Sequence, residues 1–284
     1  MRVIVRICVL FAILATPLWA SDLEGARQLY QQAAYEAAWR ALQGEGSQDA
    51  RVLLLAGQIH YQLGNYKEAS DQLEKASHLE PGHAEIFLWL GRSLGRRAET
   101  SNFFTAPGYA MRCREALERA VALDGANVDA MSSLATYYLE APGFLGGGME
   151  KAERLAAQIA VLDAAEGQSV VARMAEKRED FSAAELHLRR AAEMAPQHIE
   201  RLIELAQFFA RQGAVKQSEQ ALTQAAEIMP AAPKLLFAQA ELYIQQQRRI
   251  PEAHTLLRRY LQMPLTPGDP PRREAERLLA QTGG

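Results

Sequence analysis

Residues Gly91-Arg92-Ser93-Leu94-Gly95 match G-x-S-x-G, the pattern in which hydrolases hold a nucleophilic serine. That chemistry requires a strand before the serine and a sharp, strained turn at the serine itself. Here the apolar residues Phe87, Leu90 and Leu94 recur at helical spacing around it. We therefore expect Ser93 to lie inside a helix and to play no catalytic part.

The residues that could bind a metal or act as a thiol nucleophile are scattered. The six histidines, at 60, 78, 83, 187, 198 and 254, form neither an H-E-x-x-H pair nor a Cys–His zinc cluster. Cys113 occupies a small-residue position of an expected helix, which favours a buried, inert thiol over a reactive one. Gly146-Gly147-Gly148 is better explained by a tight turn than by an anion cradle, because the Lys and Ser or Thr of a phosphate loop are missing. The sequence thus predicts no enzyme, no metal and no cofactor.

Composition and charge are those of an ordinary folded protein. The 284 residues are 49% hydrophobic and 23% charged, which excludes simple disorder and low-complexity sequence. With 31 Lys and Arg against 34 Asp and Glu, the chain lacks the basic surplus of a nucleic-acid-binding protein. We therefore expect no nucleic-acid partner.

Residues 1–20, MRVIVRICVLFAILATPLWA, have the layout of a secretory signal peptide. Arg2 and Arg6 flank the start of an apolar segment, Pro17 breaks it, and Ala20 is a small residue after which we expect cleavage. The apolar run is short for a membrane span of ~20 residues. We expect an exported, periplasmic protein; the alternative is attachment to the membrane by an uncleaved N-terminal segment.

The rest of the chain repeats with a period of 34 residues, as between Pro196 and Pro230. The clearest copy runs Leu53-x2-Ala56-Gly57-x2-His60, then Gly64, Tyr66, Ala69-x3-Leu73, Ala76 and Pro81. This copy resembles the tetratricopeptide-repeat (TPR) family, whose pattern is W-x2-L-G-x2-Y…A-x3-F…P. The resemblance implies pairs of helices, A and B, which stack in series because no pair can hide its apolar faces alone.

The fold that the resemblance implies is all-α, a right-handed α–α solenoid of TPR helix pairs with a C-terminal capping helix. We expect a divergent N-terminal helix pair over residues 21–49 and a capping helix and tail over 268–284. Between them lie six TPR-like repeats over 50–267, at about 50–83, 84–127, 128–164, 165–198, 199–232 and 233–266. Solenoids need a polar-backed end, so the charged residues of the cap are expected to face water: Arg272, Arg273, Glu274, Glu276 and Arg277.

Two consecutive repeats carry insertions between helix A and helix B. The small residue of helix A and the helix-B position are 19 apart at 57 and 76, but 29 apart at 91 and 120 and 24 apart at 135 and 159. Because all A-to-B turns share one edge of a solenoid, the inserted loops at 100–109 and 141–148 should be neighbours. Tyr138 leads into the second loop. Together with the aromatic residues of the loops it either binds a partner or folds inward to plug the gap that longer loops leave; the loop residues are Phe103, Phe104, Tyr109 and Phe144.

The resemblance further implies a concave groove, lined by helix A, that holds extended or helical peptides. The groove positions of this chain include Tyr61, Arg92, Arg96, Thr136 and Arg173. We therefore expect a non-enzymatic protein–protein interaction scaffold or adaptor of the bacterial cell envelope, with a protein or peptide partner in the groove and at the edge formed by the two loops. The alternative is a periplasmic small-ligand-binding or transporter-associated component, which needs a closed pocket between the groove and the loops.

Overall fold

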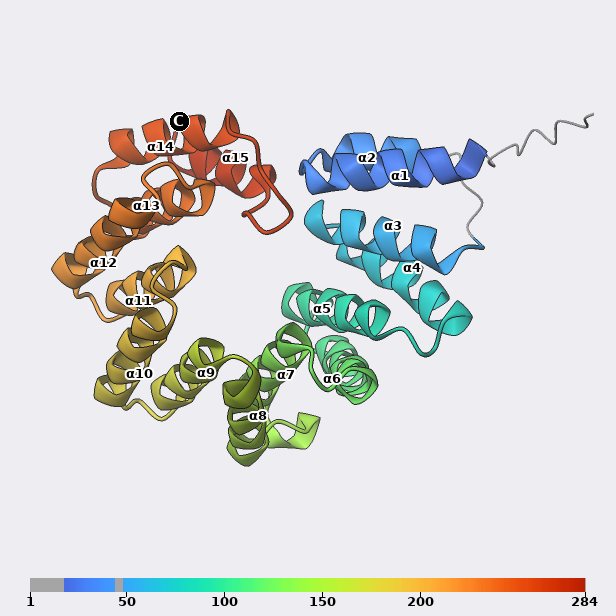
Figure 1. Ribbon diagram of the computed structural model, residues 1–284, viewed down its shortest axis with the longest axis horizontal. Coiled ribbons are helices and arrows are strands. Elements are labelled where there is room, and N and C mark those ends of the chain that lie inside the picture. Colours follow the sequence, from blue (N-terminus) through green and yellow to red (C-terminus); the bar gives the residue numbers. More distant parts are fainter. Residues whose placement is uncertain (1–17, 44–47, 284) are drawn as a thin grey trace, which may run out of the picture.

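The computed structural model describes residues 18–43 and 48–283 (Figure 1). Within these residues the chain forms fifteen α-helices, one 3-10 helix and no strand, which confirms the predicted all-α fold. The helices are α1 (Leu18–Gln31), α2 (Tyr35–Leu42), α3 (Ala50–Gln62), α4 (Tyr66–Leu79), α5 (Ala84–Thr100), α6 (Ala106–Leu123), α7 (Val128–Glu140), η1 (Gly143–Leu145), α8 (Met149–Leu162), α9 (Ala164–Lys177), α10 (Phe181–Met194), α11 (Ile199–Arg211), α12 (Val215–Ile228), α13 (Pro233–Gln245), α14 (Ile250–Leu261) and α15 (Arg272–Gln281).

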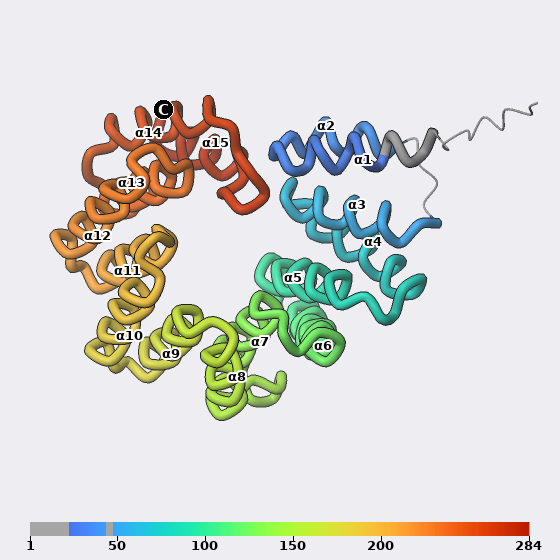
Figure 2. Tube along the Cα trace, in the orientation of Figure 1, coloured from blue at the N-terminus to red at the C-terminus, as the bar shows by residue number. Residues whose placement is uncertain are grey.

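The helices follow one another around a ring, as the trace in Figure 2 shows. Six pairs, from α3–α4 to α13–α14, are preceded by the pair α1–α2 and followed by the single helix α15. The first helix of each of the six pairs lies toward the inside of the ring and the second toward the outside (Figure 1). This arrangement is the right-handed α–α solenoid expected from the repeats.

Local sequence explains where four of the helices begin. The side chains of Asp49, Asn127, Asp163 and Asp180 each accept a hydrogen bond from a backbone N–H in the first turn of the helix that follows. Such caps satisfy donors that a helix N-terminus otherwise leaves without a partner. Asp163 also ends α8, so α8 and α9 meet at a single residue.

Glycine in the A helices brings the two helices of a pair into close contact. A Cβ added to Gly57 would lie 2.4 Å from Leu73 Cγ, and one added to Gly91 would lie 2.6 Å from Leu117 Cγ. No side chain larger than hydrogen fits there unless the partner leucine moves. These are the positions at which the repeat pattern predicted close packing.

The insertion in the second pair differs from the prediction of a long loop. Most of its residues extend the flanking helices, because α5 runs to Thr100 and α6 starts at Ala106. Pro107 lies in the first turn of α6, where proline is tolerated because its missing N–H has no helical partner in any case. Only residues 101–105 form the turn. The insertion in the third pair does form a loop, built around η1 between α7 and α8, and η1 packs against α6.

The two ends of the solenoid touch, which the repeat pattern did not predict. Residues 262–271, between α14 and α15, bond to α3 and share an apolar cluster with α1–α3, and Arg273 of α15 bonds to α4; we call these contacts the seam. Gln62 Nε2 donates to the Pro267 carbonyl oxygen at 3.2 Å, and Leu265 is 3% exposed. The expectation that Arg272 and Arg273 face water is therefore wrong: Arg272 donates to the carbonyl oxygens of Leu261 and Met263, and Arg273 donates to Tyr66 Oη.

The expected signal peptide, residues 1–20, lies outside the described residues except for Leu18–Ala20, which begin α1. Among the helices described, none combines the length and the hydropathy that crossing a bilayer requires.

Candidate functional site

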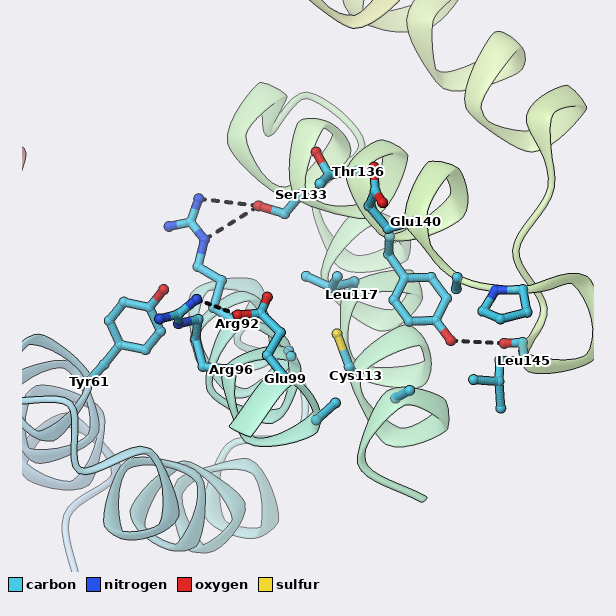
Figure 3. A pocket seen from close by; sticks show the side chains of 17 residues that line it. Tyr61, Arg92, Arg96, Glu99, Cys113, Leu117, Ser133, Thr136, Glu140 and Leu145 are labelled. Carbon is cyan, nitrogen blue, oxygen red and sulfur yellow. Dashed lines mark hydrogen bonds and ion pairs between the residues drawn. The ribbon is translucent and has the colours of Figure 1, made fainter. Parts of the chain in front are cut away.

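A pocket of about 440 Å³ opens on the inner side of the ring, between α5, α6 and α7 (Figure 3). The inserted segment 141–145 forms one of its walls. Its other lining residues come from four helices: Tyr61, Gly91, Arg92, Gly95, Arg96, Ala98, Glu99, Ala110, Cys113, Leu117, Ser133, Thr136, Tyr137 and Glu140. A volume of this size is within the range of sites that hold small ligands or protruding side chains.

The apolar end of the pocket exists because α5 carries small residues along one face. Gly91, Gly95 and Ala98 of α5 line this end together with Cys113 and Leu117 of α6, which Figure 3 labels. A Cβ on Gly95 would lie 3.4 Å from Cys113 Sγ, which is close to an ordinary contact. Burial raises the pKa of the Cys113 thiol to about 12, so the thiol is protonated at neutral pH. The prediction of a buried, inert thiol agrees with this environment.

The wall at 141–148 is held in place through its carbonyl groups. Tyr137 Oη donates to the Leu145 oxygen at 2.8 Å, Arg114 Nη1 donates to the same oxygen at 3.2 Å, and Lys151 Nζ donates to the Gly146 oxygen at 2.8 Å. Gly146 has φ of 87°, and a Cβ on Gly147 would lie 1.7 Å from the Ala141 oxygen. The glycines therefore serve a tight turn that other residues cannot make.

The polar rim of the pocket carries both signs of charge. Arg92 Nε donates to Ser133 Oγ at 3.3 Å, and its guanidinium also pairs with Asp129. Arg96 pairs with Glu99. Its guanidinium carbon lies 5.2 Å from the centre of the Tyr66 ring, a cation–π contact.

Aromatic packing fixes the side of the rim formed by α3. The Tyr61 ring lies 5.5 Å from that of Tyr66 and 5.3 Å from that of Trp89, edge to face in both cases. Burial raises the pKa of Tyr61. Its hydroxyl therefore stays protonated, available as a hydrogen-bond donor to a molecule in the pocket.

The structure separates the predicted site residues into three places. Tyr61, Arg92, Arg96 and Thr136 line the one pocket. Arg173 lies in a neighbouring hollow, where its Nη1 donates to Thr136 Oγ1 at 2.9 Å. The remaining five are aromatic residues in or next to the insertions, and they differ in exposure: Phe103, Phe104, Tyr109, Tyr138 and Phe144.

The three phenylalanines project into solvent, being 85%, 89% and 83% exposed at 103, 104 and 144. The interpretation that they plug the insertions is therefore wrong for these three. The plug interpretation does hold for Tyr138, which is 9% exposed and donates a hydrogen bond to Glu118 at 2.8 Å. It also describes Tyr109, whose ring lies 4.1 Å from the Arg97 guanidinium carbon and whose hydroxyl accepts from Arg97 Nη2 at 2.6 Å.

Sequence reasoning missed the apolar half of the pocket, formed by Cys113, Leu117, Pro142 and Leu145. One signal was present, since Gly91 and Gly95 are four residues apart and share one helix face next to the insertions. Ser93 of the G-x-S-x-G match is buried and donates to the Trp89 carbonyl oxygen at 2.8 Å, as expected of a residue inside a helix. Over residues 18–43 and 48–283, no group of three or more His, Cys, Asp or Glu side chains could hold a metal ion.

Comparison with known proteins agrees with this geometry. A family model described as tetratricopeptide repeat matches residues 50–83, which contain the α3–α4 pair. The chain carries a tetratricopeptide repeat. TPR proteins generally mediate protein–protein interactions, and the TPR fold is typically a non-enzymatic scaffold. No curated protein is significantly similar in sequence.

Solved structures extend the likeness in fold beyond the matched repeat. A thermophilic TPR protein of Thermus thermophilus is 19% identical with a TM-score of 0.56, over 67% of this chain and 98% of its own. A TPR protein of Parabacteroides merdae is 11% identical with a TM-score of 0.56, over 94% and 99%. One chain of the APC/C hetero-tetramer Cut9–Hcn1 is 16% identical with a TM-score of 0.51. The match covers 92% of this chain and 48% of that one. At these identities the likeness shows a TPR-type solenoid and nothing of the partner.

Proposed function

We propose that this TPR protein is a non-enzymatic interaction scaffold of the bacterial cell envelope, exported and periplasmic, that binds a protein or peptide partner. The partner contacts the inner side of the ring at the pocket between α5 and α7, and it also contacts the edge formed by the two insertions. The export rests on the signal-like residues 1–20 and is a proposal from sequence alone.

The observation that carries the proposal is the exposure of Phe103, Phe104 and Phe144 on two insertions whose flanking residues line the same pocket. A large apolar side chain that is over 80% exposed gains nothing for folding, and clusters of such residues mark interaction sites. The stretches around them, 101–111 and 141–149, contain no charged residue, although 23% of the chain is charged. Buried aromatic anchors supply much of the energy at protein interfaces, and charged residues are depleted at their centres.

The direct test is crosslinking in cells with a photoreactive phenylalanine analogue in place of Phe144. We expect capture of one protein partner in stoichiometric amounts, and loss of that capture when Phe103 and Phe104 are changed to alanine. The matched control places the same probe at Val161, which is 85% exposed at the end of α8 but outside the insertions. Capture of only lipid or small molecules from position 144, or equal capture from position 161, would contradict the proposal.

The pocket itself favours a second candidate function, a small-ligand-binding or transporter-associated component. That function needs an enclosed space near the groove and the loops, and the pocket walled by residues 141–145 supplies a partly enclosed one. Native mass spectrometry of the purified protein distinguishes the two. A bound metabolite that is lost when Ala98→Leu fills the pocket, but kept in the surface variant Ala157→Leu, would favour the ligand carrier.

A further inference from the structure

The seam joins parts of the chain that are far apart in sequence. Gln62 and Pro267, 205 positions apart, share a hydrogen bond. Arg273 Nη2 donates to Tyr66 Oη at 3.1 Å, across 207 positions. The buried residues of both ends, including Tyr35 and Val52 on one side and Tyr260 and Leu265 on the other, form a single apolar cluster. The ring is therefore closed by direct contact and not only by its curvature (Figure 1).

The repeats do not need the seam in order to stay folded. In a solenoid each helix pair is stabilised by its own packing and by the pairs before and after it. The contacts from α3 to α14 form an unbroken series of such neighbours. Separation of the two ends therefore exposes the seam residues without breaking any interface between successive pairs.

The closed seam also contains polar groups that closure leaves without a partner. The Tyr35 hydroxyl and Arg273 Nε are buried and make no hydrogen bond within the described residues. A buried polar group that has lost its water and found no partner costs about 1–3 kcal/mol. Opening the seam returns both groups to water. The closed state therefore carries a cost that opening removes.

One aromatic ring connects the seam to the pocket. The Tyr66 ring lies 5.8 Å from the Arg273 guanidinium carbon, on the seam, and 5.2 Å from that of Arg96, on the pocket rim. Tyr66 also packs against Tyr61, another pocket residue. A molecule that displaces Arg96 or Tyr61 therefore changes the surroundings of the residue to which Arg273 binds.

We propose that the seam is a reversible latch. In the closed state the two ends meet and the inner face is reached only through the open sides of the ring. In the open state the ends part and a long partner can enter laterally. Tyr66 couples the latch to the pocket, because Arg96 and Arg273 act on the same ring. Opening and closing of the latch does not depend on a partner, whereas its use for partner entry rests on the function proposed above.

The distance between the two ends tests the latch. Cysteines are introduced at the exposed positions 40 of α2 and 258 of α14, in the full chain carrying Cys8→Ser and Cys113→Ala. Spin labels attached to these two cysteines report the distance by pulsed electron–electron double resonance. We expect one short, narrow component for the otherwise unmodified protein. Arg273→Ala should raise a longer component by about tenfold, since a lost hydrogen bond to a charged group is worth about that factor. Leu265→Asp should raise the same component, because it places a carboxylate in the apolar cluster of the closed seam. The mild variant Tyr66→Phe, which keeps the ring and removes only the acceptor, should shift the distribution in the same direction.

Arg277→Ala is the matched control, because Arg277 is on the same helix as Arg273 but bonds only to Glu274 and Gln281. It should leave the distribution unchanged, and circular dichroism should show full helix content in every variant. Arg96→Ala should increase the longer component through Tyr66, although less than Arg273→Ala does. Identical distributions for Arg273→Ala, Leu265→Asp and Arg277→Ala would overturn the latch, and no change in Arg96→Ala would overturn its coupling to the pocket. No partner is present in this experiment, so its result is independent of the proposed function.

Discussion

Gly91 of α5 and Leu117 of α6 are in such close contact that a Cβ on Gly91 would lie 2.6 Å from Leu117 Cγ and 3.3 Å from the Leu117 backbone nitrogen. The helix could not shift away without disturbing the pocket above it. We expect Gly91→Ala to destabilise the protein by about 1–2 kcal/mol, because overpacking outweighs the gain in helix propensity. Thermal unfolding measures this as a lower Tm.

Gly95→Ala is the control for that substitution. It lies one turn further along the same helix, and its added Cβ would meet Cys113 Sγ at 3.4 Å. Overpacking is therefore small, and the helix propensity of alanine gives a Tm that is equal or higher. A Gly91→Ala protein as stable as Gly95→Ala would show that the contact with Leu117 does not determine how closely α5 and α6 pack.

The aromatic residues of the insertions should separate by their effect on stability. Phe144 is exposed, so Phe144→Ala should change the free energy of unfolding by less than about 0.5 kcal/mol. Tyr138 is buried and bonded to Glu118, so Tyr138→Ala should cost about 3 kcal/mol. Chemical denaturation of both variants makes the comparison. A large loss of stability in Phe144→Ala would restore the plug interpretation for that residue.

Much of this architecture could be predicted from spacing alone. Gly57 and Gly91 occur where the repeat requires a small residue, and the structure places both against a leucine of the next helix. The exposure of Phe144 could not be predicted, because Ala-Pro-Gly-Phe is compatible with a turn that faces either way. The chain around Pro107 was misread as loop, since proline breaks a helix interior but is accepted in a first turn.

The seam was beyond sequence reasoning for a different physical reason. Whether residue 62 meets residue 267 depends on a small rotation per pair, summed over the whole solenoid. No local pattern records that sum. The local signal is weak: Leu265 is an apolar residue in a segment rich in Pro and Gly. The structure shows that it is buried.

Glu166 of α9 is bonded to two arginines, and its removal should be costly. Its carboxylate accepts from Arg173 Nη2 at 2.9 Å, from Arg201 Nη1 at 2.7 Å and from Ser132 Oγ at 2.8 Å. Glu166→Ala leaves two partly buried guanidinium groups without this partner, for a loss of about 2 kcal/mol. The control is Glu185→Ala, which breaks the exposed pair with Arg189 and should cost less than about 1 kcal/mol. Similar losses in the two variants would mean that the Glu166 network adds no more than a surface pair.

His60 gives the stability a dependence on acid. Its ring lies 4.3 Å from that of Trp39, and burial lowers the pKa of His60 from the ordinary value of 6.5. Above pH 6.5 the imidazole is neutral in both the folded and the unfolded chain, so its contribution is fully present. Below that pH the unfolded chain takes up the proton first, and the free energy of unfolding falls until the folded pKa is passed.

His60→Leu should therefore reduce the loss of stability between about pH 6.5 and pH 5, measured by denaturant titration at each pH. Part of the loss should remain, because burial, and after it Arg190, also lowers the pKa of His187. His78→Gln changes an exposed position of α4 and should show the same pH dependence of stability as the unmodified protein. If His60→Leu and His78→Gln lose stability equally on acidification, protonation of His60 is not what weakens the contact between α2 and α3.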